Sequence, residues 1–215
     1  MTQRVHGDIV HAFESESADA QEYLHYVAGG LPIDVHVGWV YQSGGGLGRL
    51  IRQTKQSPHS TIPDRTVDKL AELTAPLAAR IAKSVDKRPG PIHILSCASG
   101  SSLNRILIRL MAGQLERLCC QVASTSELRK QPLATPLKSI LDWDQRRLAA
   151  APTCPNSLPA GMNGTTVIVD DVLASGTTIT NLANSLSCDK VIVGVLSADL
   201  PGYVQRRGKL WQSVT

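Results

Sequence analysis

The sequence predicts an α/β protein in which a central parallel sheet is flanked by helices. Aromatic residues make up only 4% of the 215 residues, whereas hydrophobic residues make up 42%. The core must therefore be built from Val, Ile, Leu and Ala, as expected of parallel strands buried under helices. Beyond residue 91, short apolar runs alternate with small-residue loops and amphipathic segments. This order is typical of strands joined by helical crossovers.

The chain before residue 91 predicts a helix, a strand and a second helix. Apolar residues within 20–27 recur at helical spacing, and two glycines follow them. In residues 34–42, Val35, Val37 and Trp39 alternate with other side chains, which predicts a half-buried strand. From residue 64 onward a long apolar face predicts a helix, with a kink or a break at the proline in its middle.

The remaining elements follow from hydrophobic periodicity and from turn residues. Strands are marked by short runs rich in Val and Ile, and helices by apolar residues three and four positions apart. One polar, basic and proline-broken stretch predicts an exposed, mobile loop. The predicted order is strand 92–96, loop 98–102, a helix from Leu103, strand 119–123, the mobile loop 124–136, a helix within 137–148, loop 151–164, strand 165–170, helix 176–186 and strand 190–198.

Charge and cysteine content narrow the class of protein. The net charge is +4, with an acidic stretch in residues 1–30 and a basic remainder, which suits an anionic ligand such as a phosphate ester. The odd number of cysteines, 5 without a C-x-x-C pair, argues against a disulfide framework or a zinc ribbon. No apolar run approaches the roughly 20 residues that span a bilayer, and the first residues do not lead into a signal-peptide core. We therefore expect a cytoplasmic protein with no membrane span.

Residues 167–178, VIVDDVLASGTT, carry the chemistry. A hydrophobic strand delivers Asp170 and Asp171 at its carboxyl end, and a loop of small and hydroxylated residues leads into a helix. Ligands of such sheets bind beyond the carboxyl ends of the strands. Loop amides and a helix N-terminus can hold a phosphate, while the adjacent carboxylates can accept hydrogen bonds from sugar hydroxyls. The order predicts a site for a sugar with a terminal phosphate. The alternative is an ordinary strand-to-helix turn that contains an acidic pair.

At all 12 positions this segment resembles the phosphoribosyl pyrophosphate (PRPP) motif of type I phosphoribosyltransferases. The resemblance implies the type I phosphoribosyltransferase fold, a central parallel sheet flanked by helices with a small hood subdomain over the strand ends. It implies that Asp170 and Asp171 hold the ribose hydroxyls. It also implies that Mg²⁺ is held near them through PRPP, without direct protein ligands. The implied ligands of the 5′-phosphate are Ala174, Ser175, Gly176, Thr177 and Thr178.

The resemblance also implies a domain organisation. Residues 1–33 are an acidic helical N-terminal extension, and residues 34–215 are the phosphoribosyltransferase-like domain, with the hood mainly in 34–90 and the core in 91–200. Within residues 40–200 the chain is most similar to ComF-like proteins, the phosphoribosyltransferases associated with natural competence, although it has no cysteine-rich zinc module. That similarity rests on Tyr41, Gly48-Arg49-Leu50-Ile51-Arg52, Lys55, Leu128-Arg129-Lys130-Gln131-Pro132-Leu133 and Arg146-Arg147, in this order before the PRPP motif.

Two further segments take their expected roles from the resemblance. The loop after the first core strand stands where the family has its pyrophosphate loop; a plain strand-to-helix turn is the alternative. Arg129 and Lys130 fall in the predicted mobile loop, where the family has a lid that excludes water, and are the candidate catalytic residues. For these two residues a solvated basic loop is the alternative. The expected pyrophosphate loop consists of Ala98, Ser99, Gly100 and Ser101.

These features predict a PRPP-binding phosphoribosyltransferase that displaces pyrophosphate from C1 of PRPP with a base-type nucleophile. The alternative is a non-catalytic protein of the same fold that acts as a regulator or in DNA uptake. No pattern in the sequence identifies the acceptor base.

The basic C-terminal tail, with Arg206, Arg207 and Lys209 near Trp211, predicts either contact with nucleic acid or a solvated surface strand. The sequence also leaves open whether the protein forms a homodimer.

Overall fold

The computed structural model describes residues 34–41, 44–58, 61–85, 90–98, 101–129, 145, 164–174, 176–186, 188 and 190–199. Several predictions from the sequence therefore lie outside the described residues. These are the N-terminal helix, nearly all of the helix within 137–148, the loop up to residue 163 and the basic C-terminal tail.

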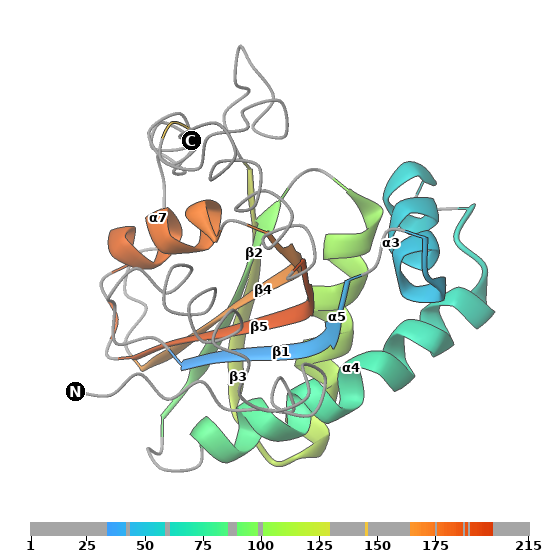
Figure 1. Cartoon of the computed structure of the whole chain (residues 1–215). Coiled ribbons are helices and arrows are strands. Elements are labelled where there is room, and N and C mark those ends of the chain that lie inside the picture. Colours follow the sequence, from blue (N-terminus) through green and yellow to red (C-terminus); the bar gives the residue numbers. More distant parts are fainter. Residues whose placement is uncertain are drawn as a thin grey trace.

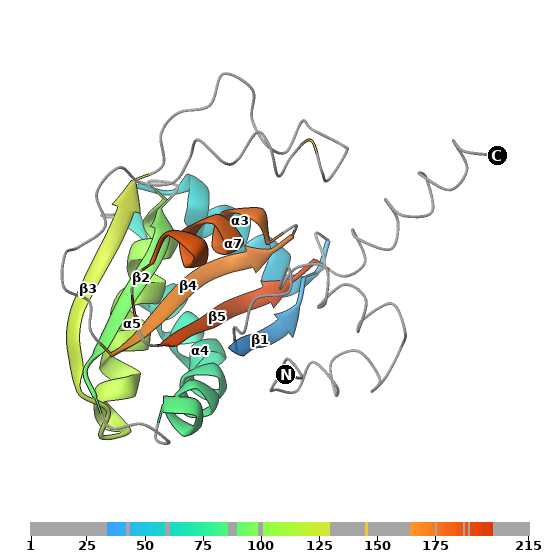
Figure 2. The same ribbon diagram turned by 90° about the vertical axis from the view of Figure 1, so that its left-hand side faces the viewer.

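The described strands form one parallel sheet, which confirms the predicted α/β architecture with a central parallel sheet. Every neighbouring pair of strands runs in the same direction. Figure 2 shows the strands side by side, from β3 (Val122–Arg129) at the left to β1 (Asp34–Val40) at the right. In the order β1-β5-β4-β2-β3, the inner strands are β5 (Lys190–Ala198), β4 (Thr165–Leu173) and β2 (Ile92–Ala98).

Helices cover both faces of the sheet. α4 (Asp64–Val85) packs against β1 and β5, α5 (Ser102–Arg117) against β2, β3 and β4, and α3 (Gly46–Gln56) against α5. α7 (Thr177–Ser185) lies on the opposite side and touches β2 (Figure 1). Right-handed crossovers explain this arrangement, because the connections β2 to β3 and β4 to β5 run in opposite directions along the sheet. Among the described helices, none is both long and apolar enough to cross a membrane.

The core lies on both sides of the sheet, as the aliphatic composition predicts. Ile94, Val167 and Ile192 pack together with side chains of α4 and α5. Their neighbours along the strands, such as Leu95 and Ile168, point to the other face because side chains alternate along a strand, and they are equally buried. The inner strands are therefore apolar at nearly every position, which explains why they could be located from the sequence.

One glycine on β5 sets the distance between α4 and the sheet. A Cβ atom built on Gly194 would lie 2.6 Å from Cδ1 of Ile81, a fully buried residue of α4. We expect Gly194→Ala to lower the free energy of unfolding by about 1–2 kcal/mol, because the packed core has little room for the extra methyl group.

Urea unfolding measures this effect, and Ile81→Val supplies the control because it removes the clashing methyl group. Alone, Ile81→Val should cost about 0.5–1.5 kcal/mol. The double variant should lose clearly less than the sum of the two single losses. Strict additivity would contradict this account of the contact.

β3 is the strand that differs most from its sequence prediction. The strand predicted at 119–123 is β3, which begins at Val122 and runs on to Arg129, so residues 124–129 are not the start of a mobile loop. β3 is an edge strand in which exposed residues alternate with partly buried ones from Val122 to Ser126. It needs few apolar residues, and this polar composition resembles that of a loop. The strand predicted at 165–170 also extends further, to Leu173.

The region predicted to supply most of the hood is joined to the sheet. β1 is hydrogen-bonded to β5 at one edge of the sheet, and α4 packs across both strands. The alternation expected in β1 is also incomplete, because His36 is buried while Trp39 is 41% exposed. Trp39 lies over α4, where its Nε1 donates a hydrogen bond to the carbonyl oxygen of Leu73 at 3.1 Å.

One described helix was not predicted, and the structure excludes one of the two alternatives expected at Pro76, a break of the helix. α3 was not predicted, because it begins in a glycine-rich stretch and buries only a narrow face, with Gly48, Ile51 and Thr54 at every third position. Pro76 does not end α4, which continues to Val85. Pro76 and Glu72 are both exposed, so the Glu72 carbonyl that loses its helical partner at the proline can be hydrated instead.

Candidate functional site

The candidate site lies where the direction of the chain along the sheet reverses. β2 and β4 are neighbours, but the chain leaves β2 toward β3 and leaves β4 toward β5. In open parallel sheets, ligands bind at the carboxyl ends of strands at such a switch point. Ser96 of β2 is the register partner of Val169 of β4, so the ends of these strands lie together. The topology therefore brings the PRPP-like motif beside the beginning of the expected pyrophosphate loop.

The acidic pair of the motif lies inside β4 and not beyond its end. Asp170 is the register partner of Val195 on β5, and Asp171 is a buried residue with 4% exposure. The backbone N–H of Asp171 donates to Oδ1 of Asp170 at 2.9 Å. Ser197 of β5 donates its hydroxyl hydrogen to the backbone carbonyl of Asp171 at 3.1 Å. These contacts hold the peptide at Asp171 between its own strand and the next.

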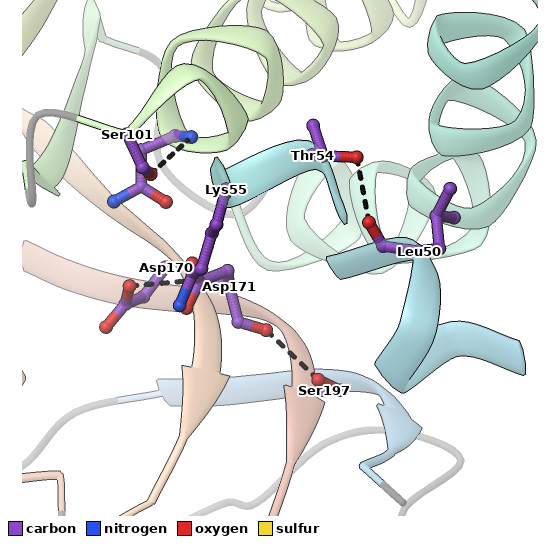
Figure 3. A network of polar contacts seen from close by, with 8 residues as sticks. Leu50, Thr54, Lys55, Ser101, Asp170, Asp171 and Ser197 are labelled. Atoms are coloured by element: carbon purple, nitrogen blue, oxygen red, sulfur yellow. Dashed lines mark hydrogen bonds and ion pairs between the residues drawn. The ribbon is translucent and has the colours of Figure 1, made fainter. Parts of the chain in front are cut away.

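Asp171 forms an ion pair with Lys55, which lies in the last turn of α3. Lys55 Nζ is 2.6 Å from Asp171 Oδ2; the side chain of Asp171 is 6% exposed and that of Lys55 is 36% exposed (Figure 3). A buried carboxylate is costly unless a cation or several donors satisfy it, so the ion pair with Lys55 offsets part of the cost of burying Asp171. Lys55 was not among the site residues predicted from the sequence. The one feature of the sequence that could have indicated Lys55 is that it belongs to the series of residues on which the similarity to ComF-like proteins rests.

The chain after α3 also contacts the start of α5. Ser102, the first residue of α5, donates its hydroxyl hydrogen to the carbonyl oxygen of Ser57 at 2.8 Å. Ser101, from the expected pyrophosphate loop, is the N-cap of α5, and its hydroxyl oxygen accepts from the Asn104 N–H at 3.5 Å. The segment from Lys55 to Ser57 therefore connects the acidic motif of β4 with the residues that follow β2.

The N-terminus of α7 has the features expected of a phosphate-binding turn. Gly176 is the N-cap and has φ 67°, a left-handed conformation that glycine adopts without strain. The N-cap residue Gly176 makes no side-chain cap of α7, whereas Ser101 caps α5. The first-turn N–H groups, which carry partial positive charge, are thus not satisfied by the N-cap residue and suit an anion. Ala174 and Thr178 flank this turn, and both are partly buried.

The other expected site residues are only partly described. Ser99, Gly100, Lys130 and Ser175 lie outside the described residues, and the same holds for the side chains of Ala98, Arg129 and Thr177. The backbone of Arg129 corrects one prediction: it is the last residue of β3 and not part of a mobile loop. Its register partner is Ala98 of β2, so its backbone lies beside the beginning of the expected pyrophosphate loop.

The acidic pair suits a metal ion that arrives with a phosphate ligand. Within the described part of the chain, no three His, Cys, Asp or Glu residues gather as a metal-binding group. Mg²⁺ commonly takes one or two protein carboxylates and completes its shell with substrate phosphates and water. Asp170 and Asp171 are oxygen donors of this kind.

No protein-family model matches the chain, and no curated protein matches its sequence.

Proposed function

We propose that the protein is a phosphoribosyltransferase with the type I fold, which binds PRPP and transfers its phosphoribosyl group to a base-type nucleophile. One observation carries the proposal. The motif residues Asp170 and Asp171 lie near the carboxyl end of the central strand β4, and the glycine-capped N-terminus of α7 follows this strand after a short turn. A sugar phosphate needs both parts, acceptors for its hydroxyl groups and donors for its phosphate. The strand order also fits the proposal, because it sets the expected pyrophosphate loop beside this motif.

In the proposed complex the chain positions the ligand at three places. The carboxylates of Asp170 and Asp171 accept hydrogen bonds from the ribose 2′- and 3′-hydroxyls. The N–H groups at the start of α7 hold the 5′-phosphate, and those of residues 98–101 face the diphosphate. These contacts fix C1 of the ribose between the leaving diphosphate and an incoming nucleophile.

The proposed reaction needs stabilisation of charge more than a strong acid or base. Displacement of pyrophosphate from C1 passes through a transition state that resembles an oxocarbenium ion, so the C1–O bond breaks while negative charge grows on the diphosphate. When bound, Mg²⁺ would neutralise part of the charge on this leaving group. Arg129 and Lys130 are the proposed residues that complete this neutralisation and exclude water. The carboxylates of Asp170 and Asp171 face the positive charge of the ribosyl group.

Titration calorimetry with PRPP in the presence and absence of MgCl₂ tests the binding half of the proposal. We expect Mg²⁺-dependent binding that Asp170→Asn weakens about 10- to 100-fold, since one charged hydrogen-bond acceptor is lost. Asp170→Asn together with Asp171→Asn should abolish it. Asp64→Asn with Asp68→Asn, which changes two exposed carboxylates of α4, is the matched control and should bind normally. Undiminished binding by the variant that lacks both motif carboxylates would overturn the site assignment.

Release of pyrophosphate tests the catalytic half. We expect release from PRPP with at least one base in a panel of purines and pyrimidines, and none with the protein that lacks both carboxylates. Normal PRPP binding with no release for any base would overturn the transferase activity. It would favour the non-catalytic alternative, a PRPP-binding protein of the same fold.

A further inference from the structure

Among the lysines for which the described residues show an ion pair, Lys55 differs from Lys69 and Lys190 in what its ammonium group contacts. Lys69 pairs with Glu72 on the surface of α4, where both side chains are more than half exposed. Lys190 pairs with Asp34 at the amino ends of β5 and β1. Lys55 is held against a buried carboxylate of the PRPP-like motif, at the carboxyl end of the sheet. Its position thus coincides with the place where the proposed substrate binds.

The ion pair at Lys55 has to change when a sugar binds to Asp171. At 2.6 Å, the ammonium group of Lys55 occupies an acceptor position of Asp171 Oδ2. Ribose hydroxyls, or a metal ion that accompanies them, require the same carboxylate oxygens. Lysine has a long, flexible stem and a rotatable ammonium group, and more than a third of this side chain is exposed. Lys55 can therefore turn away from Asp171 without any movement of α3.

The geometry of the fold indicates which part of PRPP would receive the ammonium group. α3 packs against α5, on the face of the sheet opposite α7 (Figure 1). α7 carries the expected site of the 5′-phosphate, whereas the expected pyrophosphate loop leads into α5. The hydrogen bond between Ser102 and Ser57 keeps the end of α3 against the first residue of α5. Lys55 thus approaches the site from the diphosphate side.

We propose that Lys55 is a binding residue for the diphosphate of PRPP, and that it exchanges Asp171 for phosphate oxygens when PRPP binds. This inference rests on the proposed function. The multiply charged diphosphate is a stronger partner for an ammonium group than a single carboxylate that is bonded to ribose. The exchange releases the carboxylate to the ribose and neutralises charge on the leaving group in a single movement.

The inference predicts that a change at Lys55 affects ligands with a diphosphate and spares a ligand without one. Calorimetry would compare Mg²⁺-PRPP, Mg²⁺-pyrophosphate and ribose 5-phosphate as probes. Lys55→Met, which keeps an apolar stem, should weaken binding of the first two about 10- to 100-fold. It should leave the affinity for ribose 5-phosphate unchanged or higher, because Asp171 no longer has to give up a cation. Lys55→Arg should retain most of the affinity for both diphosphate ligands.

The possible results separate this inference from the proposed function. Lys69→Met is the matched control and should bind all three ligands as the wild type does. Equal weakening of all three ligands by Lys55→Met would mean a structural role and overturn the inference. Unchanged binding of PRPP and pyrophosphate by Lys55→Met would also overturn it, while leaving the proposed function intact. If the wild type binds no PRPP, the proposed function itself fails, and the inference fails with it.

Discussion

Replacing Gly164 by alanine is expected to lower the free energy of unfolding by roughly 2–4 kcal/mol. Gly164 precedes β4 and has φ +102°, a conformation that side chains strongly disfavour. A Cβ atom there would lie 2.6 Å from the carbonyl oxygen of Pro91. The same oxygen accepts the Thr165 N–H at 3.2 Å, so relief of the clash would disturb the beginning of the β2–β4 pairing. The strain and the clash both involve backbone, which cannot move aside cheaply.

Urea unfolding of Gly164→Ala measures this loss, and Gly113→Ala is the matched control. Gly113 lies inside α5, and a Cβ atom there would meet nothing within 4 Å. The same chemical change should raise stability at Gly113 by about 0.5–1 kcal/mol, because alanine favours the helix. Equal effects at the two positions would show that the conformation of Gly164 is unimportant for stability.

The ion pair between Lys55 and Asp171 is expected to show a coupling of about 1–2 kcal/mol in a double-mutant cycle of unfolding free energies. Lys55→Met leaves a buried carboxylate without its cation, which should cost about 1–3 kcal/mol. Asp171→Asn leaves Lys55 free to turn toward water, so its cost should be smaller, about 1 kcal/mol. With Asp171→Asn already present, Lys55→Met should cost little more.

The exposed pair of Lys69 and Glu72 provides the comparison for this cycle. Its N–O distance is also 2.6 Å, but its side chains are 59% and 67% exposed. Solvent screening should reduce its coupling to about 0.5 kcal/mol or less. Two cycles with the same coupling would show that the burial of Asp171 does not strengthen its ion pair.

The parts of the fold that could be predicted from the sequence are those buried on both sides. β5 was located at its observed bounds, and β2, β4 and α7 differ by only a few residues at their ends. Apolar residues dominate the inner strands, so their signal is strong over a short window. β3 and α3 were misjudged because an edge strand and a surface helix bury one narrow side and are otherwise polar.

The candidate site also has a part that could be predicted from the sequence and a part that could not. Asp170, Asp171 and the turn before α7 are close in the chain, so their local order as a strand, two acids and a turn of small residues could be predicted from the sequence. Lys55 is distant from them in the chain, and no local pattern indicates which carboxylate it meets. The position of Arg129 opposite Ala98 likewise depends on how β3 pairs with β2.

By itself, the sequence determined that aliphatic strands alternate with helices and that an acidic pair precedes a glycine-containing turn. These properties are local, because backbone preference and side-chain periodicity depend on neighbours in the chain. Only the tertiary structure decided that β4 lies between β2 and β5, that β1 joins the sheet edge, and that Lys55 neutralises Asp171. Such pairings depend on strand register and on how helices pack across a sheet. A charge such as that of Lys55 therefore has no defined partner until the chain is folded.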